Sequence, residues 1–157
     1  MTHQRLFAVR IGAAALLVGA LLVGSASAPA GTGAPRSGEL QVTKECSQYG
    51  GLAGQFCTIT SSNVPWIRPG MKVVYLDPAN FATFTLDSDV VLSRGHGNAA
   101  RGHVDLDIAT GLGTVTLDGG RGAFRTFHAS VEVTVTDRGT PKELWHWDGT
   151  YSFGAVD

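Results

Sequence analysis

The sequence predicts an all-β protein, a single domain of short antiparallel strands. Three observations support this fold class: apolar and polar residues alternate with period two, glycines interrupt the chain too often for long helices, and seven or eight β-forming segments follow one another at short, even spacing. The 157 residues fit one domain. A sandwich and a closed barrel both agree with the segments themselves.

The expected strands follow one another from Phe56 onward and are separated by turn signals. Pro69-Gly70 and Asp77-Pro78 end the early segments, and the glycine-containing runs 109–111 and 119–122 separate the later ones. The expected segments are 56–60, 71–76, 81–93, 101–108, 113–117, 123–136 and 143–153.

Alternation in the last two segments predicts which side of the sheet is buried. Between 127 and 135 the odd positions are apolar and the even positions mostly polar, a pattern typical of a sheet with one face in water. In the final segment, Trp145 and Trp147 alternate in the same way with His146. Because a buried aromatic side chain stabilises by roughly 2–3 kcal/mol, we expect both tryptophans to anchor the core.

The first 28 residues have the pattern of a secretory signal peptide. Two arginines precede an unbroken apolar run over 11–24, and an Ala-x-Ala site ends at Ala28. The apolar run is shorter than the roughly 20 residues that a membrane span needs. We therefore expect export to the extracellular space, with no stable membrane anchor after cleavage.

The expected organisation is a signal peptide over 1–28, a disordered leader over 29–38 and one β domain over 39–157. Cleavage is compatible with Ala28 or Ala30 as the last residue removed. The leader is composed of Pro, Gly, Ala, Ser and Thr with a single Arg, a composition that cannot bury a core.

The two cysteines, Cys46 and Cys57, predict a disulfide. An even pair in an exported protein is most simply oxidised, and a bridge over so short a loop stabilises by about 2–4 kcal/mol. The competing interpretation, a metal or redox pair, lacks a Cys-x-x-Cys spacing and an intervening histidine.

Composition excludes two broad classes. Lys and Arg number 12 against 13 Asp and Glu, and no basic run stands out, so a nucleic-acid partner is not expected. With 43% apolar and 16% charged residues, the chain is too hydrophobic to be disordered throughout.

An ordered set of motifs resembles a known group. The motifs are 57–63, 69–75, 102–107 with 109–113, 119–124 before 127–129, and 145–153. Together, over about 56–153, they resemble secreted bacterial members of the allene oxide cyclase barrel-like group, which are similar to plant dirigent proteins. This resemblance implies an eight-stranded antiparallel β-barrel with a central apolar cavity. Arg121 departs from the group's pattern, which usually has threonine there.

Other kinds of site find little support. His103, Asp105 and Asp107 share one strand face, but a polar face in water explains them without a metal, and no known metal-ligand spacing occurs. No Gly-x-Ser-x-Gly is present, and the glycine-rich turns precede strands, not the helices that a phosphate site needs. We expect neither metal nor cofactor.

The leading hypothesis is a secreted barrel that binds a small apolar molecule in its central cavity. Five aromatic residues of the expected strands are the candidates to line or close that cavity. They are Tyr75, Phe84, Phe127, Trp145 and Trp147.

Two alternatives remain. A cofactor-independent cyclase or isomerase of the allene oxide cyclase type would need an ionisable group in the cavity, and Glu132, His128 and His146 are weak candidates for a catalytic role. Alternation places these three opposite the apolar face unless a bulge reverses the register. A non-catalytic surface interaction protein would instead expose an apolar patch near residues 64–67. The oligomeric state does not follow from the sequence.

Overall fold

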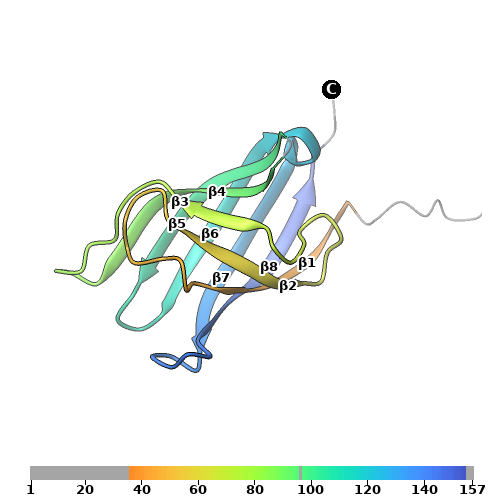
Figure 1. The fold of residues 1–157 in the computed structure, drawn as a ribbon. Helices are drawn as coiled ribbons and strands as arrows, with labels where there is room; N and C mark the ends of the chain where they lie inside the picture. Colours follow the sequence, from red (N-terminus) through yellow and green to blue (C-terminus); the bar gives the residue numbers. More distant parts are fainter. Residues whose placement is uncertain (1–35, 96, 155–157) are drawn as a thin grey trace, which may run out of the picture. The chain divides into compact units, whose positions relative to one another are not determined.

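The computed structural model describes residues 36–95 and 97–154 and confirms the all-β prediction, with a closed antiparallel barrel of eight strands (Figure 1). Each strand pairs with the next along the chain, and the last returns to pair with the first. The elements are β1 (Ser37–Glu45), β2 (Phe56–Ser62), β3 (Lys72–Tyr75), β4 (Thr85–Gly95), β5 (Asn98–Asp107), β6 (Leu112–Arg121), the 3-10 helix η1 (Gly122–Phe124), β7 (Phe127–Thr136) and β8 (Leu144–Phe153).

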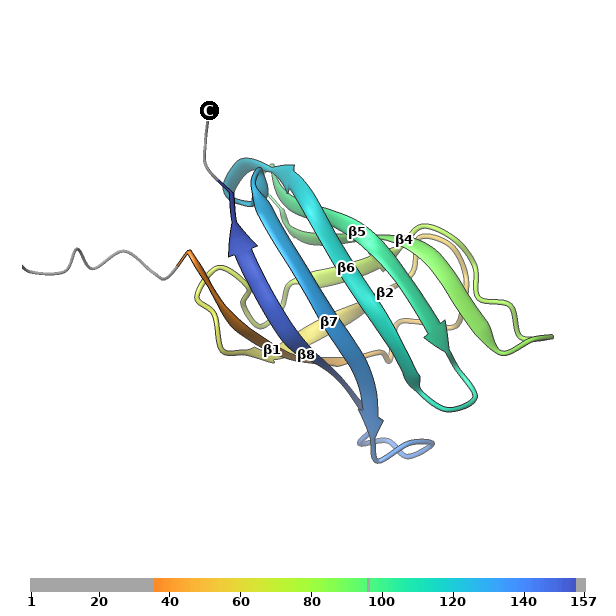
Figure 2. The ribbon, with the colours of Figure 1, turned by 180° about the vertical axis from the view of Figure 1, so that it is seen from behind.

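The long strands β5 to β8 lie side by side (Figure 2), and β7 shows the predicted alternation most clearly. In β7 every second residue from Phe127 to Val133 is buried, and the residues between them are exposed. Val133 lies opposite Trp147 in the pairing of β7 with β8, so both strands turn their apolar faces to the same side. That side is the barrel interior.

Two strand boundaries differ from the predictions for local reasons. Strand β1 begins at Ser37, so the last two residues of the expected leader are in the barrel wall. Strand β4 begins only at Thr85, because Asn80 and Thr85 pair with each other and close a turn before it. Phe84 within this turn has φ 54°, a left-handed conformation that an extended strand does not contain.

The glycine-rich run 119–122 is not simply a turn. Its first three residues belong to β6, where the pairing with β5 shifts register near Gly102, and η1 makes the connection to β7. The expected signal peptide, 1–28, and leader residues 29–35 lie outside the described residues. Within the described chain, no helix has the length and apolar character that a membrane crossing requires.

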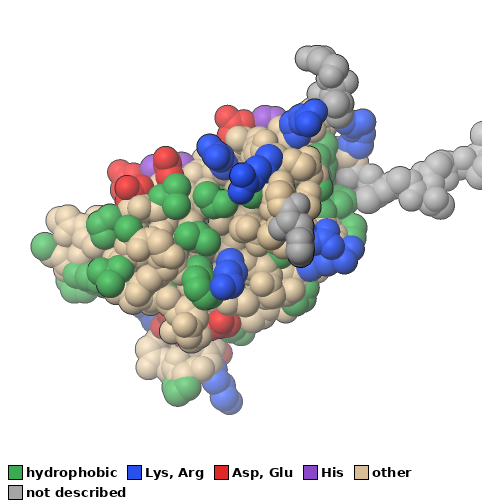
Figure 3. Space-filling view, turned by 45° about the horizontal axis from the view of Figure 1, so that its top comes forward, with side chains coloured by type: hydrophobic (Ala, Val, Ile, Leu, Met, Phe, Trp, Pro, Cys, Tyr) green, Lys and Arg blue, Asp and Glu red, His purple; other side chains and the backbone are tan. Residues whose placement is uncertain are grey.

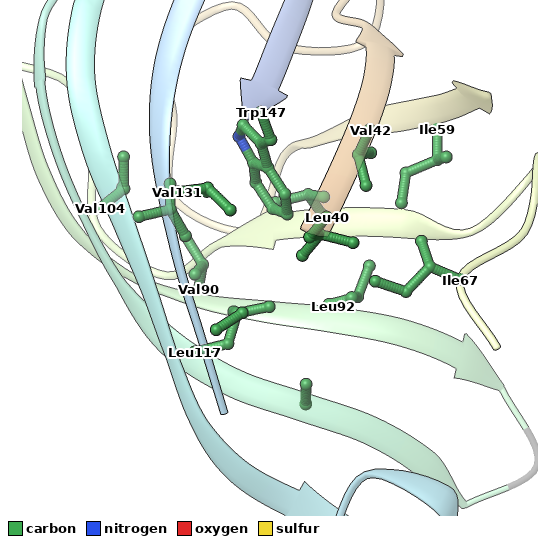
Figure 4. Packing of buried hydrophobic residues seen from close by; sticks show 14 of the residues in the cluster. Leu40, Val42, Ile59, Ile67, Val90, Leu92, Val104, Leu117, Val131 and Trp147 are labelled. Carbon is green, nitrogen blue, oxygen red and sulfur yellow. The ribbon is translucent and has the colours of Figure 1, made fainter. Parts of the chain in front are cut away.

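Side chains fill the middle of the barrel, where the resemblance implied a central cavity. Leu40 and Val42 of β1, Val104 of β5 and Trp147 of β8 converge on one interior volume (Figure 4). Trp147 is 1% exposed and is the largest of the fully buried side chains. Interiors packed in this way leave few voids larger than a water molecule.

Glycines allow neighbouring strands to approach closely. A methyl group on Gly149 of β8 would lie 2.1 Å from the backbone oxygen of Ser130 in β7, and one on Gly102 of β5 would lie 1.9 Å from the backbone oxygen of Thr116 in β6. Glycine inside a strand is typical of such bends and close approaches in barrels.

Aromatic side chains close the end of the barrel at which the described chain begins and stops. Trp66, from the connection between β2 and β3, packs edge-on against Tyr151 and Phe153 with ring centroids 5.1 and 5.2 Å away. Val64 and Ile67 in the same connection are buried. The apolar surface patch expected around residues 64–67 is therefore largely absent, because this segment packs onto the core.

Candidate functional site

A cavity of about 230 Å³ lies at the other end of the barrel. We call it the Lys44 pocket. Its walls come from strand ends that meet there, including Leu86 of β4, Leu106 of β5 and Trp145 of β8. Its roof comes from two connections, 46–55 and 76–84, through Tyr49 and Phe81. The pocket is mostly apolar with a few polar groups, as is common for small-molecule sites.

Lys44 is the charged side chain of the barrel interior at this end. It follows Leu40 and Val42 on the inward face of β1 and is 3% exposed. Its Nζ donates a hydrogen bond of 2.9 Å to the Tyr75 hydroxyl. Nζ also lies 5.5 to 5.7 Å from the ring centroids of Tyr75, Trp145 and Trp147, within the range of cation–π attraction.

Burial lowers the pKa of Lys44 from 10.5 to about 7. An ammonium ion loses its hydration here, and among the described residues no carboxylate forms a salt bridge with it. Cation–π attraction to the three aromatic rings compensates only part of the lost hydration free energy. Near neutral pH, therefore, a large share of the Lys44 side chains carries a neutral amine, which can accept a proton or attack an electrophile.

Two tyrosines extend this polar centre. Burial raises the pKa of Tyr75, and the neighbouring Tyr49 raises it further, so the Tyr75 hydroxyl stays protonated and can donate. The Tyr75 oxygen lies 3.6 Å from Cys57 Sγ. The Tyr49 ring packs on Tyr75 at 4.5 Å between centroids, and its buried hydroxyl has no hydrogen-bond partner in the described part of the chain. A bound oxygen atom would satisfy such a group.

The predicted disulfide between Cys46 and Cys57 is confirmed. It closes the connection that carries Tyr49 and Gly51 over the pocket. Gly51 has φ +88°, and a methyl group there would lie 2.4 Å from the ring of Phe81, so glycine lets the two roof segments pack together. The Ala79 amide donates to the Gly51 carbonyl at 2.9 Å and links these segments.

The exposed large apolar residues of the described chain all lie at the pocket end. Four of them are in the connections 46–55 and 76–84, and the fifth is the first residue of β6. Figure 3 shows apolar side chains gathered toward the end where the β3–β4 connection projects. The five residues are Leu52, Leu76, Phe81, Phe84 and Leu112. We call this set the apolar rim.

The five aromatic residues predicted to line a cavity have different positions. Tyr75 and Trp145 line the Lys44 pocket. Trp147 packs in the core near Lys44, and Phe127 packs among the aromatics that close the opposite end. The prediction that Phe84 lines the cavity is corrected. Its side chain is 51% exposed and belongs to the apolar rim, because Phe84 lies in the turn before β4 and not in the strand.

The three weak candidates for catalysis lie on the outer face of the barrel, as their alternation indicated. Glu132 is exposed. His128 pairs with Asp118 at 2.8 Å. His146 lies within hydrogen-bond distance of the hydroxyls of Thr43 and Thr136. None of the three borders the Lys44 pocket.

The polar face around His103 is also external. His103 contacts Asp87 at 3.0 Å and Asp89 at 3.1 Å, both on β4. The hydrogen bond to Asp89, together with the charges of neighbouring aspartates, raises the pKa of His103. Across residues 36–95 and 97–154, no group of three potential ligands is arranged to hold a metal ion.

Sequence reasoning did not identify Lys44. One signal was available: Leu40, Val42 and Lys44 stand at every second position, as the inward face of a strand would. Comparison of the chain with protein families, curated proteins and solved structures found no match. Function is therefore inferred from the pocket itself.

Proposed function

We propose that this barrel binds a small, largely apolar molecule that ends in one oxygen-bearing group. The observation that carries the proposal is the buried Lys44–Tyr75 pair, 2.9 Å apart, within an apolar cavity. A carboxylate or carbonyl oxygen next to this pair would accept hydrogen bonds from both side chains. It would also give the Tyr49 hydroxyl a partner.

The size of the pocket restricts the ligand. An apolar cavity of about 150 Å³ accommodates benzene. The 230 Å³ of the Lys44 pocket therefore suits a substituted aromatic ring or a short alkyl chain. The apolar rim would shelter the apolar part of a ligand as it enters or leaves.

Export and family membership belong to the same proposal. The signal-peptide pattern of residues 1–28 and the Cys46–Cys57 disulfide support an extracellular protein, because disulfides persist in oxidising compartments. The eight-stranded barrel is the architecture that resemblance to the allene oxide cyclase group implied. A binding function with no chemical step agrees with both.

Octanoate is expected to bind in the Lys44 pocket and to shift the methyl NMR signals of Leu86, Leu106 and Ile108. Its carboxylate would pair with the protonated amine, so affinity should be higher near pH 6 than near pH 9. Lys44→Met should weaken binding by about 10- to 100-fold, since a hydrogen bond to a charged group contributes about 1.5–3 kcal/mol.

Lys72→Met is the matched control, because Lys72 is exposed on β3 and lies outside the pocket. It should leave the affinity for octanoate unchanged. If neither octanoate nor benzoate shifts the pocket signals, or if the two methionine variants weaken binding equally, the proposal is wrong.

A cofactor-independent isomerase is the second candidate, and Lys44 and Tyr75 favour it. The neutral amine could remove a proton next to a carbonyl while Tyr75 donates to its oxygen. Cyclohex-3-enone should then be converted to its conjugated isomer, which absorbs in the ultraviolet. Wild-type protein should accelerate this conversion and Lys44→Met should not; equal rates would exclude Lys44 as the base.

A further inference from the structure

We propose that Lys44 is a nucleophile that captures small apolar aldehydes as imines within the pocket. This inference rests on the proposed function because it uses the same cavity, but it adds a covalent step. Three features of the pocket support it: the position of the amine, the hydroxyl beside it, and the apolar surroundings that would hold the aldehyde.

The amine is placed for attack on a bound carbonyl. Lys44 lines the cavity, and its Nζ donates to the Tyr75 hydroxyl at 2.9 Å and more weakly to Cys46 Sγ at 4.0 Å. Glu143 also lines the cavity, but its carboxylate accepts from Trp145 Nε1 and from the Gly139 amide, each at 2.8 Å, and among the described residues it forms no salt bridge with Lys44. The lone pair of a neutral amine in this position is available to an electrophile that fills the cavity.

Imine formation needs only the aldehyde, the Lys44 amine and a proton relay through Tyr75, and it releases water. The Lys44 nitrogen attacks the aldehyde carbon and forms a carbinolamine, and the carbonyl oxygen becomes its hydroxyl. The two hydrogens of the amine then leave with that oxygen as water, and a carbon–nitrogen double bond remains. Tyr75, protonated because burial raises its pKa, can hydrogen-bond the carbonyl oxygen and relay protons to the departing hydroxyl.

The apolar surroundings favour the captured state. An imine with an alkyl or aromatic aldehyde replaces a polar amine by a less polar group and fills the space between Leu86, Leu106 and Trp145. Hydrolysis needs water to return to the same carbon, and a filled apolar cavity holds little of it. Capture is nevertheless reversible, since no bond other than the imine forms.

Reductive trapping tests the inference. Protein is incubated with hexanal or benzaldehyde and cyanoborohydride at about pH 7, and the modified lysines are mapped by peptide mass spectrometry. The chain has three lysines, so Lys72 and Lys142 are internal controls. Lys44 should be alkylated at least about 10-fold faster than either, because burial lowers its pKa to about 7 and the cavity holds the aldehyde beside its amine.

The pH profile separates a nucleophile from a merely accessible lysine. The Lys44 rate should rise with pH and level off just above about pH 7. Tyr75→Phe should slow imine formation at Lys44 by about 10-fold without changing the rates at Lys72 and Lys142. Excess octanoate should protect Lys44 alone.

Failure of this inference differs from failure of the proposed function. If octanoate binds in a Lys44-dependent manner but Lys44 is alkylated no faster than Lys72, covalent capture is wrong and non-covalent binding stands. If Lys44 is alkylated rapidly but octanoate does not bind, the imine chemistry stands and the carboxylate-binding role is wrong. Equal labelling of all three lysines with no octanoate binding overturns both.

Discussion

Wild-type protein should gain about 3 kcal/mol of unfolding free energy between about pH 7 and about pH 9.5, and Lys44→Met should not. The folded protein holds the pKa of Lys44 at about 7, against an ordinary value of 10.5. Between these values the unfolded chain binds a proton that the folded chain does not. The stability of the wild type therefore rises with pH in this window and is lowest below it. Urea denaturation at a series of pH values measures the effect.

The methionine variant should be the more stable protein near neutral pH, because it no longer has a charge to desolvate. Lys72→Met should keep the wild-type slope, as Lys72 is exposed. Measurements should stop near pH 9.5. At higher pH the unfolded chain loses the Tyr75 proton while the folded protein keeps it, because burial raises the pKa of Tyr75, so the unfolding free energy falls again. If the unfolding free energy of wild type and of Lys44→Met changed with pH in the same way, folding would not lower the pKa of Lys44 and the prediction would be wrong.

Trp147→Ala should lower the unfolding free energy by about 3–5 kcal/mol, whereas Phe84→Ala should change it by less than about 0.5 kcal/mol. The tryptophan is 1% exposed at the centre of the core, and its removal would leave a large cavity. The phenylalanine is 51% exposed in the rim, where truncation opens no void. Chemical denaturation of the two variants side by side measures the difference.

Trp147→Phe gives a further comparison. It keeps most of the apolar ring and removes the Trp147 Nε1 group, which is buried without a hydrogen-bond partner in the described part of the chain. Trp147→Phe should lower the unfolding free energy clearly less than Trp147→Ala does. Equal losses for Trp147→Ala and Phe84→Ala would contradict the packing of the barrel interior.

The parts of the fold that the sequence predicted are those with clean alternation. β7 alternates cleanly from Phe127 to Thr134, so its buried face could be assigned from residue type, whereas the first three residues of β8 are all half-buried. β4 was placed too early, because the pairing of Asn80 with Thr85 and the positive φ of Phe84 leave no mark in a β-forming segment. The choice of barrel over sandwich depends on the pairing of β1 with β8, which local patterns do not contain.

The site was not predicted from the sequence because its central residue, Lys44, lies on the inward face of a strand, where prediction expects an apolar residue. β1 was not recognised as a strand, and a lysine is rarely placed on an inward face. The disulfide was predictable from cysteine number, and Tyr75 and Trp145 from their aromatic character. What brings these groups together is the meeting of several strand ends at one rim of the barrel, and sequence spacing does not encode it.

The pairing of the first strand with the last also determines how the protein can be held. Arg36 Nη2 donates to the Gly154 carbonyl at 2.7 Å, and the Phe153 amide donates to the Arg36 carbonyl at 2.6 Å. Both ends of the described chain therefore lie side by side (Figure 1), at the end of the barrel away from the Lys44 pocket. A resin or a carrier attached next to Arg36 or Gly154 would hold the barrel at the end away from the Lys44 pocket, so an immobilised barrel should leave that end free to meet small molecules.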